Sequence, residues 1–569
     1  MRRLPACSHT RTLAQGIPVT RIDLRQLPST STLLRDYVHR FSALAPFYAQ
    51  DPREPGAFQA QAEARDRRAY PRRDLCAVLQ AQNLAWGAPE AVTDQIRALG
   101  AADAVAVVTG QQTALFGGPL YTLYKALTTL ALARRLGTAL QRPVVPLFWM
   151  ASEDHDVAEA DHVQLADRSG GLRTLRVSAW EAPAGFMPAN LRLGPDMAAA
   201  LEELRALLPA TEFSPWLAGT LEGAFAPGRT LAEAFARWMM ALLGEDGLVL
   251  VDPADPRLKR LAAGVFQQEL TDALRTAQHI LAVSERLRAG GYPVQIESRP
   301  DAVNCFLLSG GRHALVREAA GFRLRDTGEL MAAAELQRLV EEAPERLSPN
   351  VALRPVVQDA LFPTVAYVAG PGELAYFAQL RPVYAHFGVP MPLLVPRAFL
   401  TLAEPRFLQL MERFRLGLPD LTLEPEQLTS RVLRTLLPPD VEVTLAKARD
   451  AVSEIFQGVG EAVAAVDPTL RATAGQAAGH IRGHLDQLER KAVQALKRRE
   501  ADTHQQLLRL CLALMPGGRP QERVFPALPY LAKYGPALLA SLRQAIDGPG
   551  WEHQLVSLGG SPEQSRKDA

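Results

Sequence analysis

The sequence has few cysteines, almost no net charge and no long apolar run, and each absence argues against a class of protein. Its four cysteines, Cys7, Cys76, Cys305 and Cys511, lie far apart and form no C-x-x-C pair. Neither a disulfide framework nor a zinc knuckle is therefore expected. The wide spacing instead predicts a reducing, cytoplasmic location. The formal net charge of +1 gives no reason to expect nucleic acid or an acidic membrane surface as a partner. No run of about 18 apolar residues is present, so no membrane-spanning helix is predicted.

The length and the ordinary composition indicate a globular protein of several domains. The chain has 569 residues, of which 48% are hydrophobic and 22% are charged. A single core does not extend over a chain of this length, so about two to four domains are expected. Residues 1–16 carry three arginines but no apolar stretch, and we expect a loose N-terminal extension there rather than a signal peptide.

A glycine-bearing loop between an apolar run and a helix is the first functional signal. The run Ala104–Val108 predicts a strand, and a helix with one apolar face is predicted to begin at Pro119. A strand, a glycine-rich loop and a helix in this order leave backbone N–H groups free to bind an anion. The order recurs where the strand predicted over Thr364–Ala369 ends in Gly370-Pro371-Gly372-Glu373. This repetition predicts a doubly wound α/β core.

An acidic cluster with one histidine follows the second strand of this core. The apolar run Val144–Met150 leads directly into Glu153, Asp154, His155 and Asp156. Because ligands bind beyond the carboxyl ends of the strands in an open α/β sheet, this cluster and both glycine loops are expected to line one cleft. We interpret His155 as an acid or base, or as a substrate contact, held by Asp154 or Asp156. A solvated acidic loop that caps a helix is the alternative; a metal site is not expected, because no H-x-x-x-H spacing is present.

After about Thr422 the pattern becomes purely helical. Apolar residues step by three and four from Leu445 to Val466 and again from Ala474 to Ala495, with a break at Asp467-Pro468. Two helices with such seams predict an antiparallel helical hairpin. Many seam positions are alanine, which buries little apolar area, so the hairpin is expected to dock on a second copy as a two-fold dimer.

Several motifs occur in the order found in one known family. They are V-T-G-Q-Q-T-A-L-F-G-G-P-L-Y-T-L-Y-K, F-W-M-A-S-E-D-H-D, L-S-P-N-V-A-L-R-P with F-P-T-V-A-Y-V-A-G-P-G-E, and P-Q-E-R-V-F with K-Y-G-P. With these motifs the chain resembles the BshC family, assigned to the cysteine-adding step of bacillithiol synthesis, over nearly its whole length after Ile17. The resemblance implies an enzyme that joins L-cysteine to glucosaminyl malate by an amide bond.

The resemblance also implies an architecture for the chain. It predicts an α/β fold whose core is a Rossmann-like, doubly wound parallel sheet of the class I nucleotidyl-transfer type, with inserted connective segments and a C-terminal α-helical coiled-coil hairpin. The expected divisions are the extension (1–16), three parts of the core (17–162, 229–290 and 331–421), two connective segments (163–228 and the small, β-rich 291–330), the coiled-coil domain (422–515) and a C-terminal segment that packs back on the core (516–569).

Amide formation requires an activated carboxylate, for which ATP or another adenine nucleotide is the expected source, and a group that manages the amine proton. The expected nucleotide-binding residues are five glycines of the two loops: Gly110, Gly117, Gly118, Gly370 and Gly372. The expected substrate-binding residues are Gln111, Gln112, Tyr121, Asn350, Arg354 and Glu373, and the expected catalytic residues are His155, Asp154, Asp156 and Lys125. No metal is required.

Each of these assignments has an alternative reading. The glycines can simply form the turns, and Arg354, which is suited to clamp a carboxylate, can instead form an interdomain salt bridge. Thr122 and Lys125 are expected to face outward from the first turns of their helix, and Glu373 to take an amine. Cys305 and Cys511 are interpreted as buried apolar side chains rather than nucleophiles.

Two other functions stay open at this point. One is a nucleotidyltransferase that uses the Gly110 loop on another small substrate. The other is a non-catalytic scaffold that dimerises through the hairpin.

Overall fold

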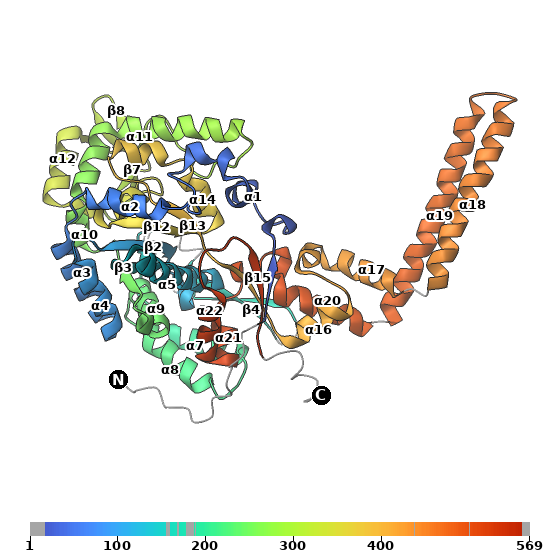
Figure 1. The fold of residues 1–569 in the computed structure, drawn as a ribbon, viewed down its shortest axis with the longest axis horizontal. Coiled ribbons are helices and arrows are strands. Elements are labelled where there is room, and N and C mark those ends of the chain that lie inside the picture. The colour runs from blue at the N-terminus through green and yellow to red at the C-terminus, as the bar shows by residue number, and fades with distance from the viewer. Residues whose placement is uncertain are drawn as a thin grey trace. The chain divides into compact units, whose positions relative to one another are not determined.

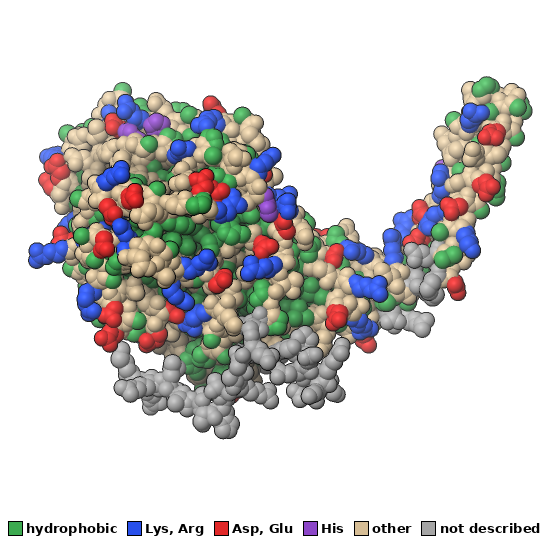
Figure 2. Space-filling view, viewed as in Figure 1, with side chains coloured by type: hydrophobic (Ala, Val, Ile, Leu, Met, Phe, Trp, Pro, Cys, Tyr) green, Lys and Arg blue, Asp and Glu red, His purple; other side chains and the backbone are tan. Residues whose placement is uncertain are grey.

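The computed structural model describes residues 18–154, 160–167, 170–177, 187, 189–436, 439–499 and 501–559. It divides the chain into two compact units, Met1–Leu402 with Pro520–Ala569, and Ala403–Arg519. Charged side chains of both signs are interspersed over the face seen in Figure 2, as expected for a chain whose net charge is +1. Within the described residues, no helix is long and apolar enough to cross a membrane.

Five parallel strands form the central sheet of the first unit (Figure 1). Their order is β13-β12-β2-β3-β6, and every neighbouring pair is parallel. The strands are almost wholly buried, which explains their continuous apolar runs. Their bounds are β2 Val105–Gln112, β3 Val144–Ala151, β6 Val249–Val251, β12 Thr364–Ala369 and β13 Leu393–Pro396. The predicted doubly wound parallel core is confirmed.

The strand order reverses direction between β2 and β12. From β2 the chain proceeds outward to β3 and β6, and then returns to the other side of β2 to add β12 and β13. Such a reversal leaves a crevice at the carboxyl ends of the two strands, where α/β proteins bind their ligands. The loops at Gly110 and Gly370 flank this point.

Helices α2 and α5 pack against the central sheet through a buried apolar cluster that includes Ala62, Leu132, Val107 and Val368. The helices of the first unit are α1 Thr32–His39, α2 Ala57–Asp66, α3 Arg72–Ala85, α4 Glu90–Leu99, α5 Leu120–Leu140, α7 Met197–Leu207, α8 Ser214–Ala224, α9 Leu231–Leu243, α10 Pro256–Leu261, α11 Ala263–Ala289, α12 Ala333–Glu342, α13 Arg354–Leu361, α14 Pro371–Phe377, α15 Arg381–His386, α21 Leu528–Tyr534 and α22 Ala537–Ala545.

Three smaller sheets complete the first unit. Their orders are β10-β9-β8-β7-β11, β1-β15-β14 and β4-β5. The bounds are β1 Val19–Ile22, β4 His162–Ala166, β5 Leu172–Arg176, β7 Ala302–Leu308, β8 Arg312–Glu318, β9 Gly321–Leu324, β10 Leu330–Ala332, β11 Leu347–Pro349, β14 Phe399–Ala403 and β15 His553–Ser557. Strand β15, which the sequence analysis did not identify, pairs antiparallel with β1.

No strand forms over residues 292–297, at the start of the connective segment that was expected to be β-rich. A side chain takes the place of a neighbouring strand there. Gln379 Oε1 accepts the N–H groups of Gln295 and Ile296 at 3.1 and 2.8 Å, and its Nε2 donates to the carbonyl of Ile296 at 2.9 Å. A side chain distant in the sequence thus satisfies these backbone groups, and no local pattern predicts that partner.

The second unit is helical. Its two longest helices, α18 and α19, run beside each other as a hairpin (Figure 1), which confirms the predicted arrangement. The helices are α16 Pro405–Arg413, α17 Pro425–Thr435, α18 Pro439–Ala464, α19 Leu470–Arg499 and α20 Ala501–Leu514.

The contact seam of this hairpin is narrower than the sequence predicted. Five of its residues are buried: Leu445, Gly460, Ala474, Ala478 and Val493. Five apolar residues that the sequence analysis placed in the seams are instead exposed: Ile455, Val459, Val466, Ile481 and Leu488. Two helices can cover only one line of contact between them, so apolar residues beside that line have nothing above them within the hairpin.

Candidate functional site

Strand register brings the predicted loops to one edge of the central sheet. Val368 pairs with Thr109, Ala369 with Pro396, and Gly110 with Trp149, which in turn pairs with Val251. The residues that come next along the strands therefore form a row across the carboxyl edge. The row is Arg397, Gly370, Gln111, Met150 and Asp252.

Lys125 is the centre of the polar contacts in this row. Its Nζ donates to the carbonyl of Gly110 at 2.7 Å and to Gln111 Oε1 at 2.9 Å, and it lies 2.5 Å from Glu373 Oε2. Burial lowers the pKa of the Lys125 ammonium, and Glu373 acts in the opposite direction. The prediction that Thr122 and Lys125 face outward is wrong, since both are buried. Helix α5 directs Lys125 toward the strand ends, where three oxygen atoms accept hydrogen bonds from its ammonium.

Glu373 is held by backbone and side-chain donors as well as by Lys125. Its Oε2 accepts the N–H of Gly370 at 2.7 Å, which caps helix α14, and its Oε1 accepts the hydroxyl of Tyr367 at 2.7 Å. The amine that Glu373 takes in this structure is thus that of Lys125. The two glycine loops are tied together by this pair.

Arg354 is a cation without a carboxylate partner among the described residues. Its Nη2 donates to the Tyr376 hydroxyl at 2.7 Å, and its Nη1 donates to Gln358 Oε1 at 3.1 Å. The guanidinium carbon lies 5.7 Å from the centre of the Tyr367 ring. Among the described residues, no salt bridge of the kind considered for Arg354 is found. Hydroxyl and amide oxygens and an aromatic face contact its guanidinium, and the carboxylate of Glu373 favours its charged form without an ion-pair contact.

Asn350 shapes the loop that leads to Arg354. Its Oδ1 accepts the N–H groups of Ala352 and Leu353 at 2.9 and 3.1 Å, and its Nδ2 donates to Asn304 Oδ1 at 2.9 Å. These contacts orient the first turn of α13.

A buried ion pair that the sequence analysis missed closes one end of the row. Arg397 follows β13 and donates to both carboxylate oxygens of Glu522, at 2.9 and 2.7 Å. Its guanidinium lies over the ring of Tyr121, 5.6 Å from the centre, and Gln111 donates to the Tyr121 hydroxyl at 3.3 Å. Two features of the sequence could have indicated these residues: Arg397 directly follows an apolar strand, and Glu522 lies in the P-Q-E-R-V-F motif. Nothing in the sequence showed that the two residues form a pair.

The predicted glycines differ in their surroundings. A side chain at Gly117, where φ is +86°, would collide with Trp238, so its backbone packs against a buried ring. Gly118, where φ is +68°, sets the turn into α5, and a side chain there would meet Ala114 at 3.1 Å. Gly110 lies against Tyr367 and Trp149, Gly370 is buried, and Gly372 is exposed in the first turn of α14 with nothing within 4 Å. Packing against Trp238 is sufficient to explain the glycine at position 117. A nucleotide-binding role for the five glycines remains a prediction.

The other end of the row is acidic. Glu153 is buried after β3, and its Oε1 accepts the ammonium of Lys259 at 2.5 Å. Ser152 donates to Asp252 Oδ1 at 2.5 Å. Asp154 follows these residues, and Gln112 is the last residue of β2, beside Ala151. His155 and Asp156 lie outside the described residues, so their placement in the cleft stays a prediction.

Cys305 and Cys511 are buried, as predicted, and burial raises the pKa of both thiols, that of Cys511 to about 11. Neither thiol is activated as a nucleophile. No group of three or more His, Cys, Asp or Glu side chains suited to a metal ion is found among the described residues.

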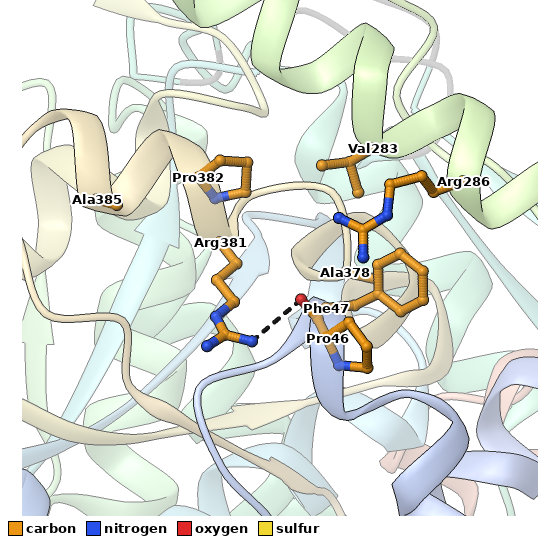
Figure 3. Close-up of a pocket in the computed structure, with 8 residues that line it drawn as sticks. All are labelled: Pro46, Phe47, Val283, Arg286, Ala378, Arg381, Pro382 and Ala385. Carbon is orange, nitrogen blue, oxygen red and sulfur yellow. Dashed lines mark hydrogen bonds between the residues drawn. The ribbon is translucent and has the colours of Figure 1, made fainter.

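One small cavity of about 230 Å³ lies away from this edge (Figure 3). Its lining is apolar apart from Arg286 and Arg381, and the guanidinium of Arg381 donates to the carbonyl of Pro46 at 3.1 Å. None of the predicted site residues lines it. The lining residues are Pro46, Phe47, Val283, Arg286, Ala378, Arg381, Pro382 and Ala385.

Comparison with known proteins covers nearly the whole chain. Residues 18–398 match the family model described as Bacillithiol biosynthesis BshC, N-terminal Rossmann-like domain, and residues 400–558 match that of the C-terminal coiled-coil domain of the same family. A protein of Salinibacter ruber is 36% identical over 92% of this chain and 96% of its own length. One of Chlorobaculum tepidum is 34% identical over 91% and 94%, and one of Solibacter usitatus is 34% identical over 93% and 98%. All three bear the name "Putative cysteine ligase BshC". With a Rossmann-like core, a helical hairpin and both family models matched along its length, the chain belongs to the BshC family of bacillithiol biosynthesis.

Proposed function

We propose that this protein is a cysteine ligase that joins L-cysteine to glucosaminyl malate through an amide bond and so forms bacillithiol. Its family and the names of its relatives support the reaction. The observation that carries the proposal is the cationic half of the sheet edge at the switch point. Among the described residues, Lys125, Arg354 and Arg397 are grouped there with the carboxylates of Glu373 and Glu522.

Arg354 is the residue proposed to bind a substrate carboxylate. Lys125 and Arg397 each have a carboxylate partner, whereas Arg354 has none among the described residues. A guanidinium binds a carboxylate through two parallel hydrogen bonds, which both malate and cysteine can accept. Tyr376 and Gln358 hold the guanidinium in place before the substrate arrives. Gln111, Gln112, Tyr121 and Asn350 complete the proposed binding wall.

An adenine nucleotide, ATP in the first instance, is proposed to activate the carboxylate. The loops at Gly110 and Gly370 support this because they lie at the switch point, where backbone N–H groups bind anions in α/β folds. Lys125, which bridges the two loops, is proposed to balance the charge that develops on the phosphate or acyl oxygen. The buried glycines Gly117 and Gly118 are proposed to shape the first loop.

The experiment on Arg354 measures product by mass from the purified full chain, cysteine, glucosaminyl malate and ATP. Replacing Arg354 with Lys keeps the charge but removes the paired donors, so KM for glucosaminyl malate is expected to rise about 10-fold to 100-fold. Arg381, which donates to the carbonyls of Ala45 and Pro46 and lies away from the sheet edge, is the control. Arg381→Lys should leave KM unchanged. If the wild-type chain forms no amide with any nucleotide, the proposed function is wrong.

His155, with Asp154 and Asp156, is proposed as an acid or base or as a substrate contact. His155→Ala is expected to reduce product formation about 100-fold or more, because a positioned acid or base contributes that much to a rate. The melting temperature of the variant should stay near that of the wild type, since the sequence predicts a loop at His155 and loop residues contribute little packing. Wild-type yield, or a lost yield with a collapsed melt, would each refute the role.

The hairpin is proposed to form a homodimer in the cytoplasm. Exposed Ile455 and Leu488, with exposed fractions of 61% and 57%, support a second copy as the cover for the outer apolar side of α18 and α19. Wide cysteine spacing supports the reducing compartment.

A further inference from the structure

Asp252 occupies the acidic end of the row, directly after strand β6. Its Oδ1 accepts two hydrogen bonds, from the Ser152 hydroxyl at 2.5 Å and from the N–H of Ala254 at 3.0 Å. No hydrogen bond to its Oδ2 is found in the described part of the chain, and the residue is partly exposed. The carboxylate is thus fixed in direction through one of its two oxygens.

The register places Asp252 across the sheet edge from the cationic half. Val251 pairs with Trp149, and Trp149 pairs with Gly110, so Asp252 is two strands away from Gln111. With neighbouring strands about 4.8 Å apart, the two backbone positions are separated by roughly 10 Å. One small-molecule substrate can span the distance between Asp252 and the Gln111 loop.

The charged groups around Asp252 come from the end of β3 and from α10. Glu153 follows β3, and Asp255 and Lys259 lie at the start of α10 and within it. Burial, helped by the Glu153 and Asp255 carboxylates, raises the pKa of Asp252 to about 6, while the donors Ser152 and Ala254 act to lower it. Lys259 is bound to Glu153 at 2.5 Å and does not form an ion pair with Asp252 in the described structure. Asp252 is therefore charged at neutral pH but binds a proton readily.

We propose that Asp252 is the general base that takes the proton from the attacking amine of the amino sugar. This inference rests on the proposed function. The amine nitrogen forms the new C–N bond with the activated acyl carbon, and the bond from that carbon to the phosphate oxygen of the nucleotide breaks. The phosphate oxygen leaves with the electron pair, and the proton from nitrogen moves to Asp252 Oδ2. Ser152 is a positioning residue that holds Oδ1.

A purely structural carboxylate would behave differently from this one. A partly buried carboxylate with a raised pKa destabilises the fold when it is charged, since the folded state then prefers the proton that neutral solution removes. Asp252→Asn is therefore expected to raise the melting temperature at pH 7.5. The gain should vanish below about pH 4, where the carboxyl of Asp252 is protonated in the folded and the unfolded chain alike. A gain in stability together with a loss of rate is the signature of a residue kept for chemistry.

The test compares kcat, KM and the pH profile of the wild type, Asp252→Asn and Ser152→Ala with the substrates named above. For Asp252→Asn we expect kcat to fall about 100-fold or more with KM changed little, and the rise in rate through pH 6 to disappear. Ser152→Ala removes a donor to the charged form, so the rise should move to higher pH. Asp246→Asn is the control and should keep the wild-type profile, because Asp246 precedes β6, at the opposite end of that strand from Asp252, and binds Arg543.

Each other result counts against the inference. If the wild type forms product but Asp252→Asn keeps kcat within about threefold, Asp252 is not the base and the proposed function stands. An unmoved pH profile in Ser152→Ala assigns the proton to another group, His155 first, and a lowered melting temperature of Asp252→Asn makes the residue structural. If the wild type forms no amide, the proposed function fails and this inference fails with it.

Discussion

Lys125 and Glu373 form a buried ion pair that stabilises the fold only when both partners are present. The side chain of Lys125 is only 4% exposed and that of Glu373 is 17% exposed. An ammonium in such a place is costly unless it is paired, and Lys125 meets this condition with one carboxylate, one carbonyl and one amide oxygen. The pair therefore joins the two glycine loops at the switch point of the sheet.

Replacing Lys125 with Met should lower the free energy of unfolding by about 3 kcal/mol, because it leaves Glu373 without its cation. The double variant Lys125→Met/Glu373→Gln should recover part of that loss, since no unpaired charge remains, but should form no product. Urea unfolding and the product assay measure the two effects. Lys447→Met, an exposed position on α18, is the control and should stay within about 0.5 kcal/mol. An additive double variant would mean that the two residues do not interact.

At the scale of elements, His553 on β15 makes the small β1-β15-β14 sheet sensitive to acid. Its Nε2 lies 2.9 Å from the Thr401 hydroxyl of β14, and burial lowers the pKa of the imidazole to about 4. The unfolded chain binds the proton near pH 6.5, so the stability from neutral His553 is complete above that pH and is lost as pH falls toward 4. At pH 5 the loss should be about 2 kcal/mol relative to pH 7.5.

The variant His553→Gln should not show this part of the acid sensitivity, because glutamine does not titrate. Urea unfolding of both proteins at pH 7.5 and pH 5 gives the comparison. The difference between the two proteins isolates His553 from opposing groups such as Asp252, whose raised pKa favours the fold at low pH. Equal losses in wild type and variant would show that His553 is already protonated or exposed.

The hairpin seam makes a prediction for α18. Gly460 is buried in the seam, and a methyl group there would lie 3.7 Å from the Cβ of Ala474, an ordinary contact. Gly460→Ala should therefore stabilise the hairpin by up to about 1 kcal/mol through helix propensity. Gly458→Ala, which meets nothing within 4 Å, is the control with the same backbone gain. Hydrogen exchange of the α18 and α19 amides in the full chain measures both, and faster exchange in Gly460→Ala alone would mean that the helices approach more closely.

At the scale of the whole molecule, the exposed apolar residues of the hairpin predict a dimer. The wild type should sediment at twice the chain mass at micromolar concentration. Ile455→Glu should shift it toward the monomer, because a carboxylate in a dry interface is costly. Glu461→Gln, an exposed polar change on the same helix, should leave the dimer intact. A wild-type monomer would contradict the proposed assembly.

The sequence alone predicted the strands, turns and helices whose formation depends on residues close together in the chain. The apolar runs that became β2, β3 and β12 were recognisable because strands covered on both faces need apolar side chains throughout. The turns after Gly110 and Gly370 and the helical hairpin followed from glycine, proline and the spacing of apolar residues. The resemblance predicted the family and its two-part architecture, and the family models confirm both.

Tertiary structure alone decided which charged and polar groups meet. Periodicity shows where apolar side chains face, but it does not show whether a charged side chain has a partner within the fold. The sequence therefore predicted an outward Lys125, whereas in the structure Lys125 pairs with Glu373 at the sheet edge. Arg397 and Glu522 lie 125 residues apart, and no local rule pairs them. The same holds for Asp252 with Ser152, which only the parallel register brings together. Ion pairs and shared protons depend on distances of a few ångströms across the fold, and those distances exist only after the chain has packed.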